Sequence, residues 1–154
     1  METQTLKTTQ LLFEEHLQLT GITEYGINWE DLNAGKESIP AEGARFDISF
    51  EGNLNGSDIQ GKVKGVDYLT VRADGKFLLR LYAIVITDDG DSVALEEDGI
   101  LIPDQEDPQY ADLQLNIKFT TASPHYAWLN KKLVWGIGQV DREKGSIYIR
   151  AYSL

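Results

Sequence analysis

Residues 111–121 read Ala111-Asp-Leu-Gln-Leu-Asn-Ile-Lys-Phe-Thr-Thr121, and this stretch decides the fold class. Apolar side chains occupy every second position from Leu113 to Phe119, and polar side chains stand between them. Successive side chains of a strand point to opposite faces of a sheet, so strict alternation predicts a strand with one buried face. Several other segments follow the same rule, which predicts an all-β protein.

Turn residues divide the rest of the chain into short segments of the same kind. Asn55-Gly56 and Asp74-Gly75 are the dipeptides that two-residue hairpin turns prefer. A chain of 154 residues without a repeat or linker is expected to form one domain, residues 1–154, with its core at about residues 9–153. We predict one small antiparallel β-barrel of eight or nine strands. The expected strands are residues 9–22, 45–54, 58–65, 68–72, 77–86, 92–102, 111–121, 133–140 and 145–152.

Two segments break the alternation and predict one or two short helical turns. Residues 26–35 place Asn28 where a helix N-cap belongs and end at Gly35, so we expect a short helix that crosses an open end of the barrel. Residues 122–130, which we name the aromatic turn, read Ala-Ser-Pro-His-Tyr-Ala-Trp-Leu-Asn. Pro124 removes a backbone donor there and ends the preceding strand. Tyrosine and tryptophan suit a boundary between apolar and wet surroundings, so this turn is expected to close the barrel mouth.

Composition excludes several classes of protein. The chain has 25 acidic and 14 basic side chains, a formal charge of −11, so nucleic acid and anionic membranes are poor partners. It has no cysteine, which excludes disulfides and thiolate sites, and two histidines, which exclude a three-histidine metal centre. Asp88-Asp-Gly-Asp91 is too short for a calcium loop and predicts a hairpin turn. We expect no metal, no cofactor and, without a leader or long apolar run, a cytoplasmic location.

Three segments resemble a widespread microbial family known as domain of unknown function 3237. They are Arg72-Ala-Asp-Gly75, Thr87-Asp-Asp-Gly90 and Ser123-Pro-His-Tyr-Ala-Trp-Leu-Asn130, within a likeness that runs from about residue 12 to about residue 152. The resemblance implies a calycin-like or allene-oxide-cyclase-like β-barrel, often oligomeric, with no agreed activity. Tyr82 matches the family, whereas Glu96 and Asp98 stand where members often carry basic residues.

Parity, meaning whether a residue stands at an odd or an even position along its strand, predicts which side chains line a pocket. If Phe119 points into the barrel, Phe46 and Phe50 do so as well, beneath the aromatic turn. Tyr82 joins them only if its face of the strand is the inner one, which we predict from the family match. The lining would be mostly apolar, so the expected partner is a small, partly apolar molecule and charged metabolites are poor candidates. The predicted ligand-binding residues are Tyr82, Tyr126, Trp128, Asn130, Phe46 and Phe50.

Three functions are consistent with the sequence. The first is a binding barrel whose pocket is closed by the aromatic turn. The second is a cofactor-free isomerase, cyclase or lyase that uses Glu15, Asp67 or His125 as its acid or base. Glu15 falls on the apolar face of the first strand, and a strongly raised pKa of its carboxyl group would favour catalysis. The third is a filled structural or interaction barrel.

The segment 77–86 also predicts an association between copies of the chain. Its apolar residues occupy both faces, so Leu78, Ile84 and Ile86 need cover from outside. We expect a homodimer to supply this cover, and the alternative is the short helix expected over residues 26–35.

Overall fold

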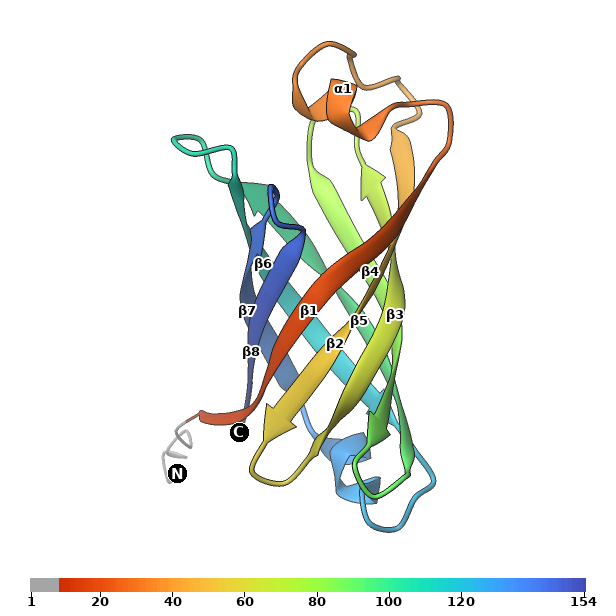
Figure 1. The fold of residues 1–154 in the computed structure, drawn as a ribbon, viewed down its shortest axis with the longest axis vertical. Coiled ribbons are helices and arrows are strands. Elements are labelled where there is room, and N and C mark those ends of the chain that lie inside the picture. Colours follow the sequence, from red (N-terminus) through yellow and green to blue (C-terminus); the bar gives the residue numbers. More distant parts are fainter. Residues whose placement is uncertain (1–8) are drawn as a thin grey trace, which may run out of the picture.

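The computed structural model describes residues 9–154, which form a closed antiparallel β-barrel (Figure 1). Each strand pairs with the one that precedes it, and β1 pairs with β8 to close the barrel. The strands are β1 (Gln10–Glu24), β2 (Ala44–Gly56), β3 (Gln60–Val71), β4 (Phe77–Thr87), β5 (Ser92–Pro103), β6 (Tyr110–Thr120), β7 (Val134–Asp141) and β8 (Ser146–Ser153). The predicted all-β barrel is confirmed. It has eight strands because the expected segments 58–65 and 68–72 belong to one strand, β3.

Glycines allow the long strands to coil tightly around the barrel. A Cβ atom on Gly52 would lie 2.0 Å from the carbonyl oxygen of His16, and one on Gly99 would lie 1.9 Å from that of Gln114. Any larger residue at these positions would push neighbouring strands apart, so the glycines permit the sharp curvature of a small barrel.

One face of β4 points into the barrel and the other points to its outer surface. Leu79, Leu81 and Val85 are buried in the barrel, whereas Tyr82 is 42% exposed on its outer surface. The prediction that Tyr82 points inward is therefore wrong. Arg80 shares the parity of Tyr82, so the opposite arrangement would have buried its guanidinium in an apolar interior. Arg80 instead donates hydrogen bonds to the Tyr82 hydroxyl from Nε and Nη2, at 3.2 and 3.0 Å.

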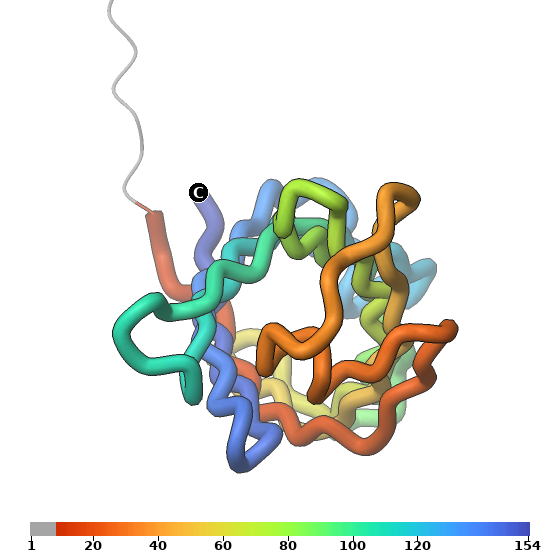
Figure 2. The backbone as a smooth tube through the Cα atoms, turned by 90° about the horizontal axis from the view of Figure 1, so that it is seen from above, coloured from red at the N-terminus to blue at the C-terminus, as the bar shows by residue number. Residues whose placement is uncertain are grey.

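Different segments lie at the two ends of the barrel. Helix α1 (Trp29–Asn33) lies at the upper end in Figure 1, and the 3-10 helix η1 (Ala127–Lys131), in light blue, lies at the lower end. Asn28 caps α1 as expected, since its side chain accepts a 2.9 Å hydrogen bond from the Asp31 N–H. Seen from above, the segment that carries α1 crosses only part of the upper opening (Figure 2).

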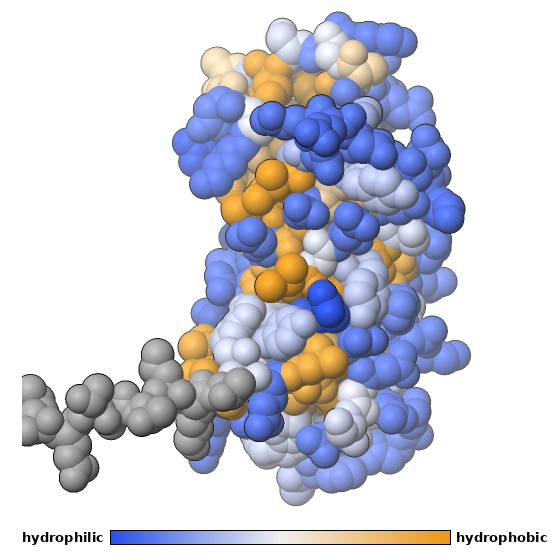
Figure 3. All heavy atoms as spheres, turned by 90° about the vertical axis from the view of Figure 1, so that its left-hand side faces the viewer, coloured by the Kyte–Doolittle hydropathy of each residue, from blue (hydrophilic) through white to orange (hydrophobic). Residues whose placement is uncertain are grey.

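The lower half of the barrel is filled by side chains. Phe13, Leu54, Ile59, Ile117 and Leu129 are all fully buried there. On the face shown in Figure 3, hydrophobic residues form separate patches among hydrophilic ones. None of the helices within residues 9–154 is long and apolar enough to cross a membrane.

Candidate functional site

The upper half of the barrel encloses a cavity of about 90 Å³. At about 30 Å³ per molecule of liquid water, this space holds roughly three waters. All eight strands contribute to its walls, which are apolar except for Asp67 of β3 and Arg142, the residue that follows β7. An apolar cavity with a few convergent polar groups is the usual form of a small-molecule site.

Trp29 of α1 lines this cavity at its upper end. The indole packs edge-on against Phe46, with ring centroids 4.8 Å apart, and against Phe77, with centroids 6.3 Å apart. The Trp29 backbone N–H donates a 2.5 Å hydrogen bond to Oε2 of Glu24, which fixes the start of the helix. Entry from the α1 end of the barrel therefore passes Trp29.

Asp67 is the carboxyl group that faces the cavity. Its side chain is 8% exposed, and its Oδ1 accepts a 3.0 Å hydrogen bond from the backbone N–H of Arg80 on the neighbouring strand. Burial raises the pKa of Asp67 to about 7, although the hydrogen bond from Arg80 acts in the opposite direction. A carboxyl group of this kind can both give and take a proton near neutral pH.

Glu15 of β1 and Glu97 of β5 are buried in the same interior, with 1% and 3% exposure. Within residues 9–154, Oε1 of each carboxyl group is buried without a hydrogen-bond partner. Burial raises the pKa of Glu15 to about 7, and it raises the pKa of Glu97 well above its ordinary value, helped by the negative charges of Glu15 and Asp67. Because like charges in a dry interior repel strongly, these three groups cannot all be ionised at neutral pH.

Arg142 supplies a positive charge to the cavity wall. Its Nη2 atom is buried and has no hydrogen-bond partner within residues 9–154. Burial lowers the pKa of the guanidinium, but an arginine remains protonated in proteins. Arg142 and Asp67 line the same cavity, and no ion pair between them is found in the described part of the chain.

Sequence reasoning missed Glu97, Arg142 and the position of Trp29. A signal for Glu97 was present, because it shares its parity with the buried Leu95 of β5. Arg142 stands in a polar turn, where side chains are ordinarily solvated, and no pattern in the sequence marks it.

The aromatic turn does not close this cavity, which corrects the expectation for residues 122–130. It follows β6 at the lower end, where Leu129 completes the packed interior. Tyr126 is buried and donates a 2.8 Å hydrogen bond to Oδ1 of Asp89, and Trp128 packs half-buried against the core. Asn130 is exposed and forms two hydrogen bonds with the backbone of Thr121, at 2.9 and 2.8 Å. These contacts hold the turn in place, so its residues lie apart from the cavity.

The two predicted phenylalanines lie nearer to the cavity. Phe50 lines it, and Phe46 is buried against Trp29 at its upper end. Glu15 and Asp67 share the interior with them, whereas His125 lies with the aromatic turn at the other end of the barrel.

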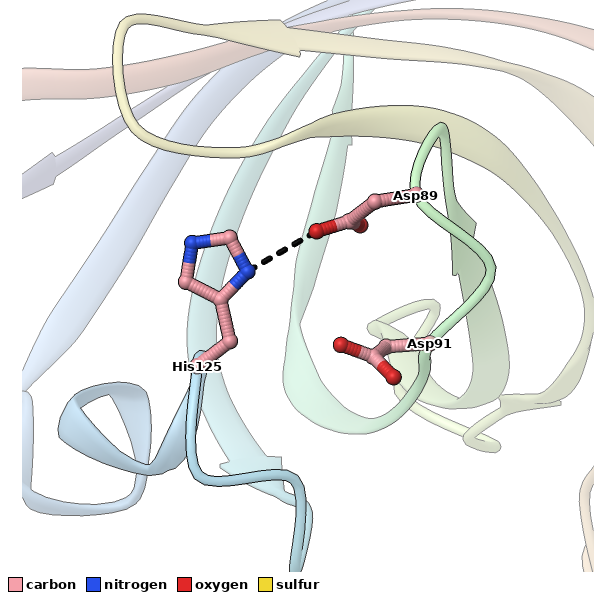
Figure 4. Close-up of side chains that lie close together, drawn as sticks. All are labelled: Asp89, Asp91 and His125. Carbon is pink, nitrogen blue, oxygen red and sulfur yellow. Dashed lines mark hydrogen bonds and ion pairs between the residues drawn. The ribbon is translucent and has the colours of Figure 1, made fainter.

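His125, Asp89 and Asp91 form a separate cluster at the lower end (Figure 4). Their potential metal-ligand atoms lie within 4.8 Å of one another, and Nδ1 of His125 is 2.8 Å from Oδ2 of Asp89. Each carboxylate already accepts a hydrogen bond from at least one hydroxyl group, including a 2.9 Å bond from Ser123 Oγ to Oδ2 of Asp91. Hydrogen bonds from the hydroxyls of Thr87 and then of Tyr126 lower the pKa of Asp89 to about 2. The cluster therefore ties the aromatic turn to the β4–β5 hairpin.

Comparison with known proteins finds the same architecture elsewhere. A family described as "Protein of unknown function (DUF3237)" matches residues 25–154. A UPF0311 protein from Clostridium acetobutylicum is 32% identical over 116 residues, 67% of this chain and 68% of that protein. A solved beta-barrel like protein from Acinetobacter baumannii has a TM-score of 0.76 at 22% identity, covering 98% of this chain and 99% of that chain. The structure of an enzyme from Penicillium herquei has a TM-score of 0.68 at 20% identity, covering 99% and 97%.

Proposed function

Because this chain belongs to the DUF3237 family, whose description assigns no activity, we propose a function from the interior of its barrel. The protein is an acid–base enzyme of the isomerase, cyclase or lyase type, in which Asp67 exchanges a proton with a small, largely apolar substrate. The observation that carries this proposal is the cluster of Glu15, Asp67 and Glu97, three carboxyl groups buried inside an otherwise apolar barrel.

Such a cluster has a cost for stability. A buried carboxyl group loses its hydration, and apolar side chains of similar volume would fill the same space without that loss. Unfavourable buried groups concentrate at sites where a function requires them, so they mark functional candidates. Of the three, Asp67 lines the cavity and can meet a ligand directly.

The hydrogen bond at Asp67 supports a separate role for each of its oxygens. Oδ1 is held by the N–H of Arg80, which leaves Oδ2 as the atom that meets a substrate. With its pKa raised to about 7, the group is part carboxylate and part acid at neutral pH. In an isomerisation, the carboxylate takes a proton from one carbon atom of the substrate, and the acid so formed returns it to another. Burial and, after it, the negative charge of Asp47 disfavour the carboxylate form and keep Asp67 basic enough for this task.

The surroundings suit such a reaction. The walls are mostly leucine and isoleucine, which leave room for few waters beside the acid, and Trp29 lines the upper end of the cavity. Benzene occupies cavities of about 150 Å³, so a substrate with a ring needs Trp29 to move aside. The Penicillium herquei neighbour is described as an enzyme, which agrees with a catalytic role for a barrel of this fold.

Proton exchange with solvent deuterium tests the proposal without knowledge of the substrate. Small ketones and unsaturated ketones would be incubated with the protein in D2O, and deuterium incorporation at carbon followed by NMR. We expect exchange on at least one compound that falls by roughly 10²- to 10⁴-fold in Asp67→Asn, the usual contribution of a general acid or base. Asp112→Asn, an exposed aspartate on β6, is the matched control and should exchange like the wild type. Exchange that is equal in Asp67→Asn would contradict the proposal.

A second candidate is a binding protein for a small, partly apolar molecule, and the apolar cavity itself favours it. In that case the carboxyl groups only orient the ligand. Native mass spectrometry of the purified protein would then find a bound molecule, and the protein would catalyse no proton exchange on the ketones named above.

A further inference from the structure

We propose that the cavity binds a small monoanion with an apolar body, whose negatively charged oxygen pairs with the guanidinium group of Arg142. This inference rests on the function proposed for the same cavity and names the chemical class of its ligand.

Arg142 carries the first step of the argument. Its guanidinium keeps a positive charge, and Nη2 is buried with no acceptor within residues 9–154. Arg142 is half-buried, and leaving one of its charged donors buried without an acceptor costs free energy, which an anionic oxygen bound at the guanidinium group would offset. Hydrogen bonds from arginine to an anionic oxygen are among the strongest that a protein forms.

The other groups at the cavity limit the charge of the ligand to one. Asp67 is the other ionisable group that lines the cavity, and whenever it is protonated Arg142 supplies the net charge of the wall. A cation would be repelled by Arg142. A dianion such as phosphate would bring a second negative charge against a wall that has one positive charge, Arg142, to balance it.

The walls and the volume define the rest of the ligand. The remaining lining is apolar, and about 90 Å³ accommodates a short chain rather than a ring while Trp29 stays in place. From the sequence, charged metabolites were expected to be poor ligands, because the alternation pattern placed phenylalanines in the pocket. The same pattern could not place Arg142, which lies in a turn, at the pocket wall. The structure adds one positive charge to that apolar lining, so a single negative charge on the ligand becomes favourable.

Arg142 and Asp67 then have complementary tasks. The cation holds the charged oxygen of the ligand, and this fixes which carbon atoms come near Oδ2 of Asp67. Arg142 is thus a binding and positioning residue, and Asp67 moves the proton.

Butyrate is a suitable probe, with butyramide as its neutral counterpart of similar shape. Both would be titrated into the wild type, Arg142→Met and Arg142→Lys, and binding followed by NMR chemical shifts of the methyl groups that line the cavity. We expect butyrate to bind the wild type at least about tenfold more tightly than butyramide, equal to about 1.4 kcal/mol. Arg142→Met should lose this preference, and Arg142→Lys should retain part of it because the charge remains. Arg150→Met, which removes an exposed arginine of β8, is the matched control and should behave like the wild type.

Equal binding of butyrate and butyramide by the wild type would overturn the inference. So would an unchanged preference in a folded Arg142→Met protein, and Arg142→Lys decides the matter if the methionine variant does not fold. Loss of anion binding alongside Asp67-dependent deuterium exchange overturns this inference alone. Anion binding without any such exchange overturns only the proposed catalysis.

Discussion

The backbone N–H of Arg80 donates its hydrogen bond to the side chain of Asp67, at 3.0 Å, where two paired strands run side by side. In the ladder between β3 and β4, Asp67 pairs with Leu81, and the next regular pair is Thr70 with Leu78. Between these two pairs the Asp67 side chain, in place of a backbone carbonyl, accepts the hydrogen bond from Arg80. The position of the carboxyl group is therefore fixed by the barrel wall.

This contact predicts different outcomes for two substitutions of Asp67. Asp67→Asn keeps an oxygen that accepts from Arg80, whereas Asp67→Ala leaves that N–H without its partner and enlarges the cavity. We expect the alanine variant to be less stable than the asparagine variant by roughly 1–3 kcal/mol. Urea unfolding of both variants measures the difference, and equal midpoints with equal slopes would show that the hydrogen bond contributes nothing.

The buried Glu15 predicts a dependence of stability on pH. Its folded pKa of about 7 lies above the ordinary 4.5, so its stabilising contribution is complete below about pH 4.5 and is lost as pH rises through 7. Asp67 and Glu97 face the same interior and have raised pKa values, so they act in the same direction. Glutamine does not ionise, and between pH 5 and pH 8 we expect Glu15→Gln to gain on the order of 3 kcal/mol of unfolding free energy relative to the wild type.

Chemical denaturation at the two pH values measures this gain. Glu51→Gln, which removes an exposed carboxylate of β2, should show no such gain. A constant difference between Glu15→Gln and the wild type at both pH values would mean that Glu15 ionises freely in the folded protein.

Trp29 predicts a change in the size of ligand that the cavity accepts. Trp29→Ala removes the indole that covers the upper end, so we expect the affinity for benzoate to rise about tenfold relative to that for butyrate. The variant should also lose about 2 kcal/mol of stability, since a half-buried aromatic side chain is truncated. Trp135→Ala, on β7 and outside the cavity lining, serves as control in the same NMR titration. An unchanged ratio in Trp29→Ala would place the entrance elsewhere.

Asn130 predicts a purely structural effect at the opposite end. Its amide pairs with both backbone groups of Thr121, so Asn130→Ala should lower the unfolding free energy by roughly 1–3 kcal/mol. Circular dichroism should report an intact barrel, and ligand binding should be unchanged. Asn116→Ala, an exposed asparagine of β6, gives the baseline for removal of an amide. A loss no greater than this baseline would show that the turn is held by its packing alone.

The outer face of β4 predicts a homodimer. Ile84 and Ile86 are 45% and 44% exposed beside Tyr82, and α1 lies at the upper end of the barrel rather than over this face. We expect sedimentation equilibrium to find a dimer at micromolar concentrations and Ile84→Lys to dissociate it. A wild-type monomer at high micromolar concentration would remove the expectation.

Much of the fold followed from alternation, because one polar and one apolar face fix the direction of each side chain. Residues 111–121 are the clearest case, with Leu113 and Phe119 buried as expected. Alternation could not orient β4, because apolar residues stand on both of its faces. The family resemblance at Tyr82 favoured an inward side chain there. Arg80 lies on the same face of the strand, and its charge was the better indication that this face points outward.

The site was harder to predict, since parity says which way a side chain points but not which end of the barrel is hollow. That depends on how the coiled strands and the caps fill each half, as Leu129 and Phe13 do at the lower end. Glu15 stood out as a carboxylate in an apolar pattern, and Asp67 was among the candidate acids. Arg142 was missed because it stands in the polar turn after β7, and no pattern in the sequence shows which atoms of a turn side chain become buried.

The unequal ends of this barrel have a consequence for its evolution. The tightly packed lower half maintains the fold, so the helix and hairpins around the upper opening can vary in sequence while the strands beneath them stay closed. Descendants of such a chain can acquire new ligand preferences by small changes at one rim. Directed evolution confined to residues 25–43 and 141–146 would exploit this separation.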